Sequence, residues 1–147
     1  MKKLLVALDG SARARGVLSA ASSLASRMDA RLVLVRATSI AGELPVEAYA
    51  SDPEEVERVL AERALADLEE MAKDCTRPEL VAAIRAEPGP AWRVIDDVAR
   101  TEDADMIVIG AHGYGTLERV LGTVAAKVVD RADRPVFVVR APERLLS

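Results

Sequence analysis

The chain has 147 residues and a net charge of −4; 50% of its residues are hydrophobic and only 3% are aromatic. This length fits one domain, residues 1–147, with a core of Val, Leu, Ile and Ala side chains. The acidic balance argues against nucleic acid as a partner, because nucleic-acid-binding proteins usually carry a basic face. No segment approaches the roughly eighteen apolar residues that a membrane helix requires. We therefore expect no membrane as a partner. The single cysteine, Cys75, excludes an internal disulfide bond, which predicts a cytoplasmic protein.

The first half of the chain alternates predicted strands with predicted helices. Leu4–Leu8 and Leu32–Val35 are short, continuous apolar runs, which are typical of strands buried on both faces. Between them lies a predicted helix with Ser11 as its N-terminal cap. The apolar residues of this helix recur at spacings of three and four, at Val17, Ala20, Ala21, Leu24 and Met28. Thr38–Asp52 has no periodicity, and loops of that length are often functional. Pro53 occupies the first position of a long predicted helix.

The second half continues the alternation. The predicted strands are Leu80–Ile84, Met106–Ile109 and Val136–Val139, and a helix precedes each of the last two. Strands that alternate with helices predict an α/β fold with a parallel sheet and right-handed crossovers. Five such strands commonly take the order 2-1-3-4-5 or 3-2-1-4-5, and periodicity does not choose between the two. In both orders a ligand binds at the carboxyl ends of the strands, where the order reverses.

The segment Met106–Thr123 is the best candidate for a binding site. Gly110 follows a buried strand directly, and Gly122-Thr123 begins the next helix. Glycine allows the backbone to approach a ligand closely, and a helix N-terminus attracts anions. The segment therefore predicts the phosphate-binding edge of a nucleotide site. The glycine spacing alone fits an ordinary strand-to-helix turn equally well.

The same glycines resemble a known family signature. Gly110, Gly113 and Gly122-Thr123 resemble the nucleotide-binding pattern of the universal stress protein family, G-x2-G-x9-G-[S/T], with eight residues instead of nine before Gly122. Leu5–Ser11 is similar to the opening strand of that family, and Arg134–Arg140 is similar to its closing strand. The resemblance covers essentially the whole chain. It implies a Rossmann-like, doubly wound sheet of five parallel strands, in the order 3-2-1-4-5 with helices on both faces.

The resemblance also implies a ligand and a set of site residues. The ligand is ATP or AMP, and Mg²⁺ can accompany such a nucleotide because that ion uses few protein ligands. The residues expected around the nucleotide are Ala7, Leu8, Asp9, Ala37, Ile109, Gly110, His112, Gly113, Gly122, Thr123 and Val124. Asp9 is expected to meet the ribose or to order the first turn, and Ala37 to lie near the base.

The leading hypothesis is an ATP- or AMP-binding regulatory protein acting in stress response, a role that comes from the resemblance alone. No catalytic residue is assigned, and one His and one Cys cannot form a structural zinc site. A slow ATP hydrolase is one alternative, and it would need His112 or Asp9 at the γ-phosphate. A second alternative is an interaction module that has lost nucleotide binding, which the short Gly113–Gly122 turn favours. A phospho-acceptor receiver domain fits less well, because Asp9 stands alone after its strand.

The last strand predicts a homodimer. Val136, Phe137, Val138 and Val139 are all apolar and would form an edge of the sheet. An exposed apolar edge invites pairing with another strand, and a second copy would cover it through a two-fold interface. The resemblance implies the same dimer. The alternative is that Pro135 and Arg140 protect the edge.

Overall fold

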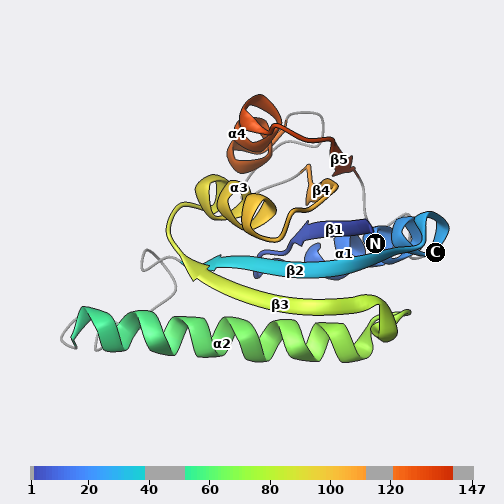
Figure 1. The fold of residues 1–147 in the computed structure, drawn as a ribbon. Coiled ribbons are helices and arrows are strands. Elements are labelled where there is room, and N and C mark those ends of the chain that lie inside the picture. The colour runs from blue at the N-terminus through green and yellow to red at the C-terminus, as the bar shows by residue number, and fades with distance from the viewer. Residues whose placement is uncertain (1, 39–51, 112–120, 141–147) are drawn as a thin grey trace.

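The computed structural model describes residues 2–38, 52–111 and 121–140. Within these ranges, five strands form a sheet with the order β3-β2-β1-β4-β5 (Figure 1). The strands are β1 (Lys2–Ala7), β2 (Ala30–Thr38), β3 (Val81–Pro88), β4 (Met106–Gly110) and β5 (Val136–Val139). Every pair of neighbouring strands runs parallel. The structure therefore confirms the predicted α/β class and the order that the family resemblance implied.

Helices cover both faces of this sheet. They are α1 (Ala14–Met28), α2 (Pro53–Asp74), α3 (Ala91–Thr101) and α4 (Thr123–Arg131), with a short 3-10 helix, η2 (Pro78–Leu80), before β3. Figure 1 shows α2 on the opposite side of the sheet from α3 and α4. Side chains alternate along a strand, so β1 sends Leu4 and Val6 toward α1 and α2, and Leu5 toward α3 and α4.

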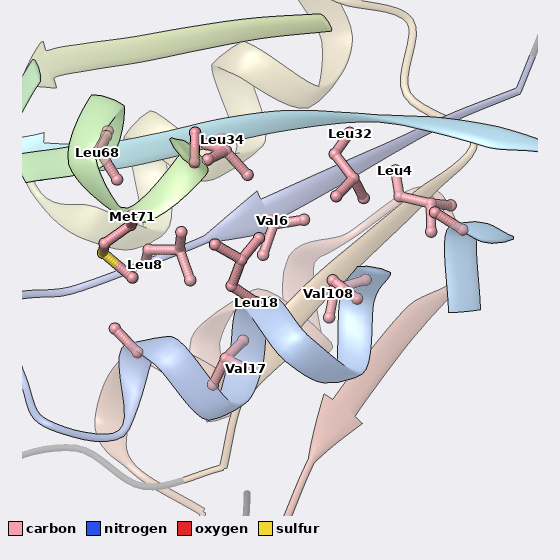
Figure 2. Packing of buried hydrophobic residues seen from close by; sticks show 14 of the residues in the cluster. Leu4, Val6, Leu8, Val17, Leu18, Leu32, Leu34, Leu68, Met71 and Val108 are labelled. Carbon is pink, nitrogen blue, oxygen red and sulfur yellow. The ribbon is translucent and has the colours of Figure 1, made fainter. Parts of the chain in front are cut away.

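The core consists of aliphatic side chains, as the composition predicts. On the face of α1 and α2, Leu18, Leu34 and Leu68 are almost completely buried and belong to one packed cluster (Figure 2). No helix in the described ranges is both long and apolar enough to cross a membrane.

Several element boundaries differ from the sequence prediction: β1 and β2 begin two residues earlier than predicted, and β3 ends at Pro88 instead of Ile84. Strand β2 extends three residues past the predicted end at Val35, because Arg36, Ala37 and Thr38 pair with the last residues of β3. Helix α1 begins at Ala14 and not directly after Ser11. Pro53 starts α2 as predicted, and the Asp52 carboxylate caps this helix by accepting a hydrogen bond of 3.1 Å from the Glu54 N–H.

Candidate functional site

A cavity lies at the carboxyl ends of β1 and β4, the central pair of strands where the order of the sheet reverses. Its volume is about 140 Å³, several times the roughly 30 Å³ that one water molecule occupies in the liquid. This is the position at which parallel α/β sheets bind ligands, because the connections leave the two strands in opposite directions and open a crevice.

The structure brings most of the predicted site residues together around this cavity. The lining includes Ala7, Leu8, Asp9, Ala37, Ile109, Gly110, Gly122 and Val124. Thr123 does not belong to the lining, and its side chain is exposed. The predicted residues His112 and Gly113 lie outside the described residues, as do residues 39–51, which make up most of the long loop.

Several residues of the lining were missed by the sequence analysis. They are Ser11, Arg13, Ala14, Val17, Val35, Arg36, Ala91, Ile95, Ala111, Ala125 and Val139. Ala14 and Ala91 are the first residues of α1 and α3. The predicted topology could have placed these two residues at the site, because each helix that directly follows a strand begins at the carboxyl edge of a parallel sheet.

The electrostatics of the cavity favour an anion. Helices α1, α3 and α4 all begin at the lining, and none of them has an acidic residue in its first turn. Helix α2 contributes no described residue to the lining and has Glu54 and Glu55 in its first turn. Arg13 adds a cation at the N-cap of α1, where the helix dipole disfavours positive charge. An anionic ligand would compensate both the helix termini and this arginine.

The start of α4 offers the clearest donors for such an anion. The Gly122 N–H donates to the Ala111 carbonyl at 2.8 Å, and the Gly122 carbonyl accepts from the Ala126 N–H at 2.9 Å. The N–H groups of Thr123, Val124 and Ala125 are the first three of the helix, and an α-helix offers such groups no carbonyl of its own. Since Val124 and Ala125 line the cavity, these donors lie at its edge.

The Asp9 carboxylate orders the turn after β1. Its Oδ1 accepts a hydrogen bond of 2.9 Å from the Ser11 N–H, and the Asp9 side chain is exposed. The Ser11 hydroxyl in turn accepts from the Arg13 N–H at 3.3 Å. One of the two roles expected of Asp9 is therefore present, and an ionised carboxylate retains further acceptor sites for a ribose hydroxyl.

One wall of the cavity is apolar and tightly packed. Val35, Ala37 and Ile95 belong to the cluster between the sheet and α3 and α4. On the other side, a Cβ atom at Gly110 would lie 3.1 Å from Cγ2 of Val17. A larger residue at position 110 would therefore require Val17 of α1 to shift by a few tenths of an ångström. An apolar lining with a few polar groups is typical of sites for small molecules and cofactors.

Among the described residues, no group of three or more His, Cys, Asp or Glu side chains is placed to hold a metal ion.

Comparison with known proteins identifies the family. A model described as the universal stress protein family matches residues 1–140. The chain belongs to the universal stress protein family. The resemblance noted in the sequence is thereby confirmed.

The relatives of this universal stress protein match it over nearly its whole length. A Staphylococcus aureus (strain USA300) protein named for the same family is 30% identical over 144 residues, which cover 97% of this chain and 86% of the relative. The structure of universal stress protein UspA from Lactobacillus plantarum has a TM-score of 0.74 at 24% identity and covers 95% of this chain and 97% of its own. The match confirms that the two proteins share a fold.

Two further structures of this fold were solved with nucleotides. A universal stress protein in complex with cAMP has a TM-score of 0.66 at 22% identity, with 95% of this chain and 97% of that one covered. A universal stress protein from Archaeoglobus fulgidus in complex with dAMP has a TM-score of 0.57 at 20% identity, with 95% and 98% covered.

Proposed function

We propose that this universal stress protein binds an adenine nucleotide, AMP or ATP, in the cavity beside β1 and β4 and acts as a regulatory protein in stress response. One observation carries the proposal: three helices without acidic first turns begin at one cavity, opposite an apolar wall. Family members with cAMP and dAMP bound support the choice of an adenine nucleotide. The stress role rests on the family alone.

The cavity suggests how the nucleotide would lie. The phosphates would accept from the first N–H groups of α4, at Val124 and Ala125, because these donors and the helix dipole favour negative charge. The adenine would contact the apolar wall formed by Ala37 and Ile95. The ribose would meet Asp9, whose carboxylate could also serve as the protein ligand of a Mg²⁺ ion held mainly by phosphate oxygens.

Nucleotide binding is tested by identifying what the purified protein carries. Mass spectrometry of small molecules released from protein purified without added nucleotide should detect AMP or ATP. Calorimetric titration of the stripped protein with AMP, ATP and adenosine should then show tighter binding of the nucleotides than of the nucleoside. If the protein carries no nucleotide and gives no heat with AMP or ATP, the interaction module becomes the better description.

A carboxylate introduced at the start of α4 is expected to weaken AMP binding without lowering the stability of the protein. Val124 lines the cavity and is 38% exposed. Val124→Asp should weaken AMP binding about tenfold, because like charges repel at short range. The same change should leave the melting temperature unchanged or raise it, since helix N-termini favour acidic residues. Calorimetry and thermal unfolding measure the two effects.

Val129→Asp is the matched control for this experiment. Val129 is a second exposed valine of α4, and it lies near the end of the helix, away from the cavity. A carboxylate there should leave the AMP affinity unchanged and lower the melting temperature, because the dipole disfavours negative charge at a helix C-terminus. Equal affinities for the two variants would place the phosphates away from α4.

We further propose that β5, at the edge of the sheet, forms the interface of a homodimer. In the described part of the chain, β5 pairs with β4 alone, and its Phe137 side chain is 42% exposed. Phe137→Glu should convert dimers into monomers, because a charge would have to be buried at the interface. Analytical ultracentrifugation measures the change, and Val129→Asp should sediment like the wild type. A monomeric wild type would instead indicate that the edge is protected within one chain.

A further inference from the structure

Arg36 joins the turn after β1 to helix α2. Its Nε donates to the Leu8 carbonyl at 3.2 Å, and its Nη2 donates to the Asp9 carbonyl at 3.0 Å. Its Nη1 lies 3.1 Å from a carboxylate oxygen of Asp67 in α2. One guanidinium therefore binds two consecutive carbonyl groups of the turn and also contacts Asp67, which lies in the second half of α2.

The Leu8 carbonyl needs a partner outside the sheet because the chain leaves β1 at this point. The Leu8 N–H still donates to the Val35 carbonyl at 2.9 Å, but β1 itself ends at Ala7. Leu8 is 3% exposed, and a buried carbonyl without a donor is costly. Arginine suits the position because its planar fork donates in several fixed directions at once.

Arg36 belongs to the lining of two hollows of the surface. It lines the proposed nucleotide cavity, together with Leu8 and Asp9. It also lines a shallower polar hollow between the turn and α2, together with Asp67 and Glu70. Arg36 is 12% exposed at its side chain, whereas Asp67 is 65% exposed. Because Asp67 is largely exposed, its ion pair with Arg36 contributes little, and the partly buried hydrogen bond to the Leu8 carbonyl is the contact best shielded from water.

We propose that Arg36 is a positioning residue that fixes the turn from Leu8 to Ser11 in the geometry the nucleotide requires, and ties this turn to α2. The nucleotide part rests on the proposed function. Arg36 acts on the ligand through Asp9, whose carboxylate orders the same turn by accepting from the Ser11 N–H. A positive charge alone would not fix the turn, because Arg36 holds it through N–H groups that point in fixed directions.

Arg36→Lys tests the proposal because it keeps the positive charge and removes the fork. Amide hydrogen exchange of the ligand-free protein, measured by NMR, should become faster at Ser11, Arg13 and Ala14, which donate within the turn. Exchange at Val108 in the sheet core should stay unchanged. In calorimetry the variant should bind AMP about tenfold more weakly, because one fixed hydrogen bond to a charged group is lost. Arg36→Gln should behave alike, since the fork and not the charge is needed.

Arg85→Lys is the matched control. Arg85 is also a partly buried arginine with a fork on two partners, the carboxylates of Glu87 and Glu102, but it lines neither hollow. Arg85→Lys should leave both the amide hydrogen exchange rates of the turn and the AMP affinity unchanged. If Arg36→Lys matches the wild type in exchange, the positioning role is overturned, even where AMP binds. If the wild type binds no AMP while Arg36→Lys still speeds exchange in the turn, the proposed function fails and the positioning of the turn stands.

Discussion

Gly110→Val is expected to weaken AMP binding more than tenfold and to lower the free energy of unfolding by about 1–3 kcal/mol, a typical cost of overpacking. A Cβ atom at this position would already lie 3.1 Å from Cγ2 of Val17, and the two added methyl groups would extend from a residue that lines the cavity. Calorimetry measures the affinity, and urea unfolding measures the stability. Gly110→Ala should have a smaller effect on both, because Val17 needs to move by only a few tenths of an ångström.

The control for this prediction is a buried position of the core away from the cavity. Ala104 is 4% exposed, packs in the cluster of α3 and α4, and does not line the cavity. Ala104→Val should therefore lower stability by a similar amount and leave the AMP affinity unchanged. Wild-type affinity in Gly110→Val would show that the nucleotide does not lie against the end of β4.

Leu34→Ala is expected to lower the free energy of unfolding by about 2–5 kcal/mol, the usual range for removing a buried leucine side chain. Leu34 is 0% exposed in β2 and lies among Leu18, Leu68 and Met71 of the two helices on that face (Figure 2). Because α1 and α2 close over it from two directions, the cavity left by the truncation has little room to collapse. Urea unfolding monitored by circular dichroism measures the change.

Val129→Ala provides the comparison for this core substitution. Val129 is 46% exposed on α4, so its truncation should change the free energy of unfolding by no more than about 0.5 kcal/mol. If the two truncations cost the same, the face between the sheet and α1 and α2 does not form the main core.

The nucleotide binding proposed for this protein depends on where its helices begin. In a parallel α/β sheet each helix that directly follows a strand starts at the same edge, so the N-termini of α1, α3 and α4 meet at one cavity. Their positive ends add up, and the first turns contain no carboxylates that would cancel them. Helix α2 begins with Asp52, Glu54 and Glu55 and lies away from this cavity. The distribution of acidic residues thus follows the proposed position of the phosphates.

Local patterns in the sequence were sufficient to predict most elements. The continuous apolar runs at β1 and β4 predict buried strands, because a strand covered on both faces has no polar side. Pro53 predicts the start of α2, because a proline at the first helical position loses no hydrogen bond. The strand order came from the family resemblance, since periodicity describes one strand at a time and contains no information about its neighbours.

The ends of β2 and β3 show where local patterns fail. Arg36, Ala37 and Thr38 lack the apolar run that marks the rest of β2, yet they are strand because each pairs with a residue of β3. Glu87 and Pro88 lie beyond the predicted end of their strand at Ile84 and are not apolar in pattern. They are nevertheless the last residues of β3, because they pair with Ala37 and Thr38 of β2. Strand length at a sheet edge depends on a partner far along the chain.

The sequence by itself determined that Gly110 ends a buried strand and that Gly122-Thr123 begins the next helix, and it predicted an anion site at that helix start. Only the tertiary structure decided which side chains face the cavity: Val124 lines it and Thr123 does not. It also decided the contacts of Arg36, whose partners Leu8, Asp9 and Asp67 lie 27 to 31 residues away. The physical reason is the same in both cases. Backbone conformation follows from neighbouring residues, whereas the direction and partners of a side chain depend on elements that meet only when the chain folds.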